Sequence, residues 1–157
     1  MATVELRFGT VPAHVRTARL IAAAVARRSG VDDALIDEVK LAIGEACSRA
    51  MTLHEAHGRP EQVVVELHEG EREFVAVVSD CGPAEPSYAI PEAREADLPA
   101  LMATSIGIPS GENGEPVAAP LRLALIAALV DELTVDRAGE RTHVRMRWTL
   151  PAQYLPG

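Results

Sequence analysis

Two valine-rich segments that face each other across a short turn constrain the fold of this chain most strongly. Residues 62–68 (QVVVELH) and 73–79 (EFVAVVS) flank Glu69-Gly70-Glu71, a composition typical of a hairpin turn. Residues 3–8 (TVELRF) alternate apolar and polar side chains, which predicts a further short strand. We therefore expect a sheet built around an antiparallel hairpin.

Two helical patterns separate the first strand from this hairpin. The first begins near Pro12, a residue suited to the first helical turn, and ends near Gly30. The second begins where Asp32 or Asp33 can cap it and continues to about His54. Its apolar positions recur at three- to four-residue spacing: Leu35, Ile36, Val39, Ile43, Ala46, Cys47 and Ala50. Each helix therefore presents one apolar face to a core.

The second half of the chain begins with a segment of different character. Residues 81–120 hold most of the prolines and little periodicity, which predicts a lid-like loop, with a short helix possible at 92–102. An almost wholly apolar helix is expected at 121–130. A second hairpin follows, with strands at about 132–137 and 142–149.

This order of elements predicts one α+β domain spanning residues 1–157. Strands paired with helices on one face form a two-layer sandwich with a mixed or antiparallel sheet. The length of 157 residues suits a single core. Hydrophobic residues make up 48% of the chain but aromatic residues only 3%, so we expect an aliphatic core.

Composition also argues against several classes of function. The formal net charge is -8 and no block of Lys or Arg is present, which argues against direct nucleic-acid binding. The longest apolar stretch, Leu121 to Val130, is about half the length of a membrane span. Cys47 and Cys81 form neither a disulfide framework nor a metal-binding spacing, so we expect free thiols, a cytoplasmic location and no metal site.

The string Leu41-Ala42-Ile43-Gly44-Glu45-Ala46-Cys47-Ser48-Arg49-Ala50 resembles the second-helix motif of anti-sigma-factor serine kinases, which have the histidine-kinase-like ATPase fold. The resemblance implies that Glu45 is the catalytic base if the protein is an active kinase. Arg49 stands where the family has the asparagine that holds magnesium. Arginine carries five donors and no acceptor, so it cannot ligate magnesium, although it can contact phosphate or pair with Glu45.

Two further motifs concern the nucleotide. The pair Asp80 and Gly82 resembles the family's Asp-x-Gly, in which the aspartate accepts a hydrogen bond from adenine and the glycine admits the base. The family's phosphate-binding glycines are replaced here by Pro120-Leu121-Arg122-Leu123, and its closing Gly-Thr pair is Arg141-Thr142. If a nucleotide or another anion binds, the resemblance places Arg49, Asp80, Gly82, Arg122 and Thr142 around it.

The first helix carries the expected partner surface. Arg16-Thr17-Ala18-Arg19-Leu20 is similar to the family segment that grips the sigma factor and the anti-anti-sigma protein, so Arg16 and Arg19 are the candidate contacts. The alternative interpretation is a pair of solubilising charges. The family also commonly forms homodimers.

Three functions remain open from the sequence. The first is a partner-switching anti-sigma-factor-like regulator that binds a sigma factor, a STAS-domain anti-anti-sigma protein or both, with no cofactor. The second is an active serine kinase that uses ATP and magnesium. The third is a different anionic ligand held by Arg49, Arg122 and Arg141.

Overall fold

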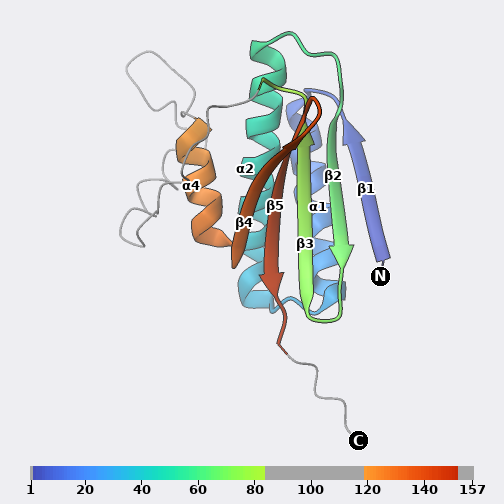
Figure 1. The fold of residues 1–157 in the computed structure, drawn as a ribbon. Coiled ribbons are helices and arrows are strands. Elements are labelled where there is room, and N and C mark those ends of the chain that lie inside the picture. The colour runs from blue at the N-terminus through green and yellow to red at the C-terminus, as the bar shows by residue number, and fades with distance from the viewer. Residues whose placement is uncertain (1, 84–118, 152–157) are drawn as a thin grey trace, which may run out of the picture.

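The computed structural model describes residues 2–83 and 119–151. Within them, three helices and five strands follow one another in the predicted order (Figure 1): β1 (Ala2–Phe8), α1 (Pro12–Ser29), α2 (Asp33–Ala56), β2 (Val63–Glu69), β3 (Glu73–Asp80), α4 (Ala119–Leu129), β4 (Glu132–Ala138) and β5 (Arg141–Thr149). The expected α+β sandwich is confirmed. The possible helix at 92–102 and nearly all of the predicted lid lie outside the described residues.

The five strands form one sheet in the order β1-β2-β3-β5-β4, and every neighbouring pair is antiparallel. The chain therefore inserts its last strand between β3 and β4. In this register Asp80 at the end of β3 lies opposite Thr142 at the start of β5. The predicted site therefore lies at the edge of the sheet where β3 ends and β5 begins.

The helix termini follow from local chemistry. Pro12 lies in the first turn of α1, where its missing N–H costs nothing. Gly30 ends the helix in the left-handed conformation at φ 100°, which glycine adopts without a steric penalty. The Asp32 carboxylate accepts a hydrogen bond from the Ala34 N–H at 3.0 Å and so caps α2.

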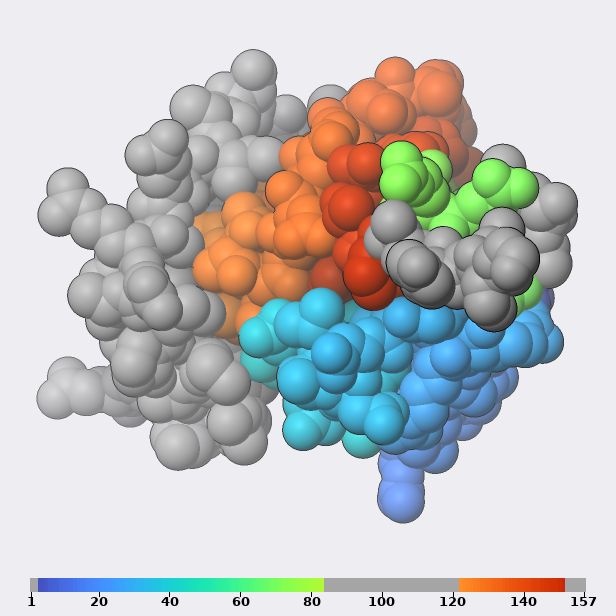
Figure 2. All heavy atoms as spheres, turned by 90° about the horizontal axis from the view of Figure 1, so that it is seen from below, coloured from blue at the N-terminus to red at the C-terminus, as the bar shows by residue number. Residues whose placement is uncertain are grey.

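The core lies between the sheet and the helices, which cover one face of it (Figure 1). Seen from below, the blue and cyan residues around the α1–α2 connection lie on one side, and the strand ends together with the orange α4 lie on the other (Figure 2). Alanines make up much of the buried faces of α1 and α2, including Ala18, Ala22, Ala42 and Ala46. Larger aliphatic residues of the inner strands fill the space against the sheet, as the composition predicts.

The apolar helix α4 closes the second half of the core. It begins at Ala119, two residues before the expected start, which places Pro120 in its first turn. At its other end the Trp148 indole donates to the Leu129 carbonyl at 3.1 Å and lies against the Phe74 ring, 5.7 Å between centroids. This contact anchors the C-terminus of α4 to β3 and β5.

Candidate functional site

The predicted site residues of α2, β3, α4 and β5 gather at one end of the sheet. Glu45 and Arg49 lie four residues apart on α2, and both are buried. Asp80, at the end of β3, is buried beside them. The sequence motifs therefore meet in space, as the family resemblance implies.

A buried ion pair stands at the centre of this cluster. Arg49 Nη1 lies 2.9 Å from Asp80 Oδ2, and the two side chains are 2% and 1% exposed. The other oxygen, Oδ1, accepts the Gly82 N–H at 2.9 Å. Both oxygens of the carboxylate are thus bonded within the protein.

The packing around Gly82 leaves little room for a side chain. A Cβ added at this position would lie 3.0 Å from Leu53 Cβ and 3.0 Å from Asp80 Oδ1. The side chain of Leu53, on α2, therefore occupies the space beside the Gly82 backbone. The glycine admits a leucine here, where the family resemblance implies a nucleotide base.

His54 belongs to the site although the sequence did not assign it a role there. Its ring is buried, Nε2 accepts the Cys81 N–H at 2.8 Å, and Nδ1 lies 3.0 Å from the Glu61 carbonyl. These partners assign the proton to Nδ1. The side chain links the end of α2 to the segment after β3, and its place at the predicted helix end was one signal for this in the sequence.

Arg137 on β4 is a second contact that sequence reasoning missed. Its Nη1 donates to the Gly82 carbonyl at 3.1 Å and to Thr142 Oγ1 at 3.1 Å. The register places Arg137 directly opposite Thr142. The predicted hairpin already brings Arg137 opposite Thr142, but the bond to the Gly82 carbonyl depends on β3 lying beside β5.

Two more predicted arginines lie near the cluster. Arg122 Nη1 is 3.8 Å from the Glu45 carboxylate, so the candidate base faces a cation. Arg141 has a buried Nη1 that makes no hydrogen bond within the described part of the chain. Convergence of Arg49, Arg122 and Arg141 on an anion stays a prediction, with Arg49 already bonded to Asp80.

The predicted partner contacts lie on α1. Arg16 is exposed, whereas Arg19 is half-buried and reaches over α2 near Gly44. Burial raises the pKa of the neighbouring Cys47 thiol from 9.0 to about 12, and the positive charge of Arg19 opposes that rise. The thiol is therefore protonated at neutral pH.

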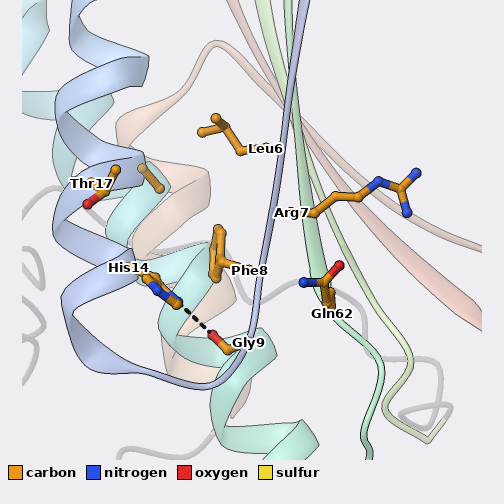
Figure 3. A pocket seen from close by; sticks show the side chains of 8 residues that line it. Leu6, Arg7, Phe8, Gly9, His14, Thr17 and Gln62 are labelled. Carbon is orange, nitrogen blue, oxygen red and sulfur yellow. Dashed lines mark hydrogen bonds between the residues drawn. The ribbon is translucent and has the colours of Figure 1, made fainter.

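A pocket of about 240 Å³ lies elsewhere, between β1 and the start of α1. In Figure 3, Leu6 and Phe8 point towards the helix, and His14 contacts the Gly9 carbonyl. None of the predicted site residues lines it. Its volume is below the range of about 300–1,000 Å³ usual for small-molecule sites.

Neither a metal cluster nor a membrane-spanning helix is found within the described residues. No three His, Cys, Asp or Glu side chains of residues 2–83 and 119–151 gather as metal ligands. In the same part of the chain, no helix combines the length and apolar character of a membrane span.

The chain has an antiparallel sheet covered on one face, and its acidic second helix lies beside the Asp-x-Gly end of a strand. Together these features define a two-layer domain of the kinase-like ATPase class. The family model described as histidine kinase-like ATPase domain matches residues 8–148, so the chain belongs to this family.

One similar solved structure is the SiaB–SiaC complex from Pseudomonas aeruginosa. The TM-score is 0.53 at 11% identity, over 94% of this chain and 89% of that chain. At this identity the likeness concerns the fold alone. The comparison with curated proteins gives no match.

Proposed function

We propose that this chain is a partner-switching regulator of the anti-sigma-factor type, which acts through protein contacts and not through phosphoryl transfer. The observation that carries the proposal is the buried Arg49–Asp80 pair, which lies where the family resemblance puts the adenine contact. The partner would be a sigma factor, a STAS-domain anti-anti-sigma protein or both.

The ion pair argues against the family's usual binding of adenine. Asp80 is 1% exposed, so a base could reach its carboxylate only if a group that covers it, such as the Arg49 guanidinium, moved away. Separating a buried pair leaves an uncompensated charge and costs about 3–5 kcal/mol. That cost corresponds to a loss of about 10²- to 10⁴-fold in affinity.

The groups expected at the phosphates also fit a triphosphate poorly. Arg49 has no acceptor for magnesium, and Pro120 has no amide hydrogen to donate. The candidate base Glu45 lies 3.8 Å from the Arg122 guanidinium, which competes with a substrate hydroxyl for the carboxylate. These features favour a domain that has kept the ATPase architecture for other uses.

The first helix supports a protein partner. The α1 segment carries four arginines and no acidic residue, in a chain with 23 Asp and Glu. Arg16 and Arg19 have no ion pair within residues 2–83 and 119–151, and the adjacent Leu20 is 54% exposed. One similar solved structure is a complex of two proteins, SiaB and SiaC. We infer that α1 contacts an acidic surface.

Calorimetric titration with magnesium-ATP is the first test of this proposal. We expect no binding below millimolar concentrations. Micromolar affinity, or transfer of labelled phosphate from ATP to a STAS-domain protein, would instead favour the active serine kinase with Glu45 as base.

The second test measures binding to purified STAS-domain proteins and sigma factors of the source organism. We expect one of them to bind and the Arg16→Ala/Arg19→Ala variant to bind it at least about 10-fold more weakly. Arg27→Ala is the matched control, because Arg27 lies on the same helix but faces Asp33 at 3.8 Å. Equal weakening by both variants would count against the specific surface. Light scattering of the free protein tests the predicted homodimer.

A further inference from the structure

Gly44 is an unusual residue for its position in the middle of α2. A glycine inside a helix is less favourable than alanine because it loses more backbone freedom on folding. Its backbone does not need glycine, since the glycines with positive φ among the described residues are Gly30, Gly58 and Gly139. Its side-chain surroundings give the reason for the missing Cβ.

The side chain of Arg19 crosses α2 directly above Gly44. A Cβ added at Gly44 would lie 3.0 Å from Arg19 Nε, 3.1 Å from Cδ and 3.5 Å from Cζ. The first two distances are tighter than most real Cβ contacts, so a side chain at Gly44 would push the Arg19 stem outwards by a few tenths of an ångström or more. Gly44 therefore forms a notch that holds the stem of Arg19.

Arg19 is held in the notch by packing and not by charge. Its Nε is buried and makes no hydrogen bond within the described part of the chain. On the same helix, Arg28 forms two hydrogen bonds to Glu69, at 2.7 and 2.8 Å. A guanidinium with a desolvated and unpaired donor is costly, so its position calls for an explanation beyond stability.

We propose that Gly44 is a positioning residue that holds the Arg19 guanidinium ready for a carboxylate of the protein partner. This inference rests on the proposed function, in which Arg19 contacts the protein partner. A carboxylate fits because arginine pairs with it through two parallel hydrogen bonds, and because α1 has no acidic residue to compete. Because the stem is already fixed before the partner arrives, the Arg19 side chain loses less conformational entropy on binding.

The first experiment uses the free protein and needs no partner. The Nε–H signal of Arg19 in a ¹⁵N NMR spectrum should exchange with water more slowly than that of the exposed Arg16. Gly44→Ala should bring the two rates together while the melting temperature stays at or above that of the wild type, since alanine favours the helix. Equal exchange rates in the wild type would overturn the proposed notch.

The second experiment measures binding to the STAS-domain protein or sigma factor selected above. Gly44→Ala should weaken binding about 2- to 10-fold, the effect of one side chain regaining its rotamer freedom. Arg19→Ala should weaken it more, and the double variant should match Arg19→Ala alone. A loss of affinity with no loss of stability distinguishes positioning from a structural role.

The outcomes separate failure of this inference from failure of the proposed function. If Arg19→Ala weakens binding but Gly44→Ala does not, or if the two effects add, Gly44 is not a positioning residue. If Arg19→Ala binds as tightly as the wild type, the proposed partner contact itself is wrong, and the role of Gly44 in binding falls with it.

Discussion

Breaking the Arg49–Asp80 pair should destabilise the protein far more than removing both charges together. At 2.9 Å and an effective dielectric constant of about 20, the Coulomb attraction is about 6 kcal/mol. Desolvation of two side chains that are 2% and 1% exposed offsets most of it. The net value of the pair is thus small, but either charge left alone is costly.

The perturbation is a double-mutant cycle with Arg49→Met and Asp80→Asn. Methionine keeps the length of the side chain without charge, and asparagine keeps an oxygen for the Gly82 N–H. Each single variant should lower the free energy of unfolding by about 3–5 kcal/mol. The double variant should recover part of this loss, with a coupling energy of about 2–4 kcal/mol measured by urea unfolding.

The matched control is the pair Arg147–Glu73, whose N–O distance is shorter, 2.6 Å, but whose side chains are 34% and 36% exposed. The same cycle there should give a coupling below about 1 kcal/mol. If the effects of the buried substitutions add within about 0.5 kcal/mol, the reasoning about this pair is refuted.

Three other predictions concern the surroundings of the site. His54→Leu removes a partner from the Cys81 N–H and should cost about 1–3 kcal/mol in urea unfolding, whereas His54→Gln should cost less because an amide can still accept and donate. Gly82→Ala should cost about 1–3 kcal/mol because its Cβ would lie 3.0 Å from Leu53 Cβ, and a Leu53→Ala background should reduce that cost if the contact is the cause. Burial raises the Cys47 pKa from 9.0 to about 12, so between these pH values the unfolded chain releases the thiol proton first and stability falls as pH rises. Against Cys47→Ala, wild-type unfolding should show an extra slope of up to about 1.4 kcal/mol per pH unit, and equal slopes would contradict the shift.

The order and type of the elements could be predicted because they depend on local patterns. Alternation in the strands, the three- to four-residue spacing in α2, Pro12 and Gly30 at the helix ends and the Asp32 cap each act within a few residues. The motif residues Glu45, Arg49 and Asp80 were also found to lie together, because the family resemblance supplied the topology.

The contacts made by those residues could not be predicted from local patterns. Whether Arg49 turns to Glu45 or to Asp80 depends on which carboxylate the sheet brings close. Arg49 bonds to Asp80 because the end of β3, the central strand of the order β1-β2-β3-β5-β4, lies beside α2 in the folded protein. The contact of Arg137 with the Gly82 carbonyl depends in the same way on β3 lying beside β5.

The sequence by itself determined the sandwich architecture, the aliphatic core and the arginine-rich first helix, because hydrophobic periodicity and charge depend only on the order of residues along the chain. Only the tertiary structure decided that Asp80 is bonded to Arg49 and that Leu53 fills the space beside Gly82. The same holds for Gly44, which supports Arg19 from another helix. The physical reason is that these contacts join side chains 25 or more positions apart, and their geometry exists only once the helices have packed on the sheet.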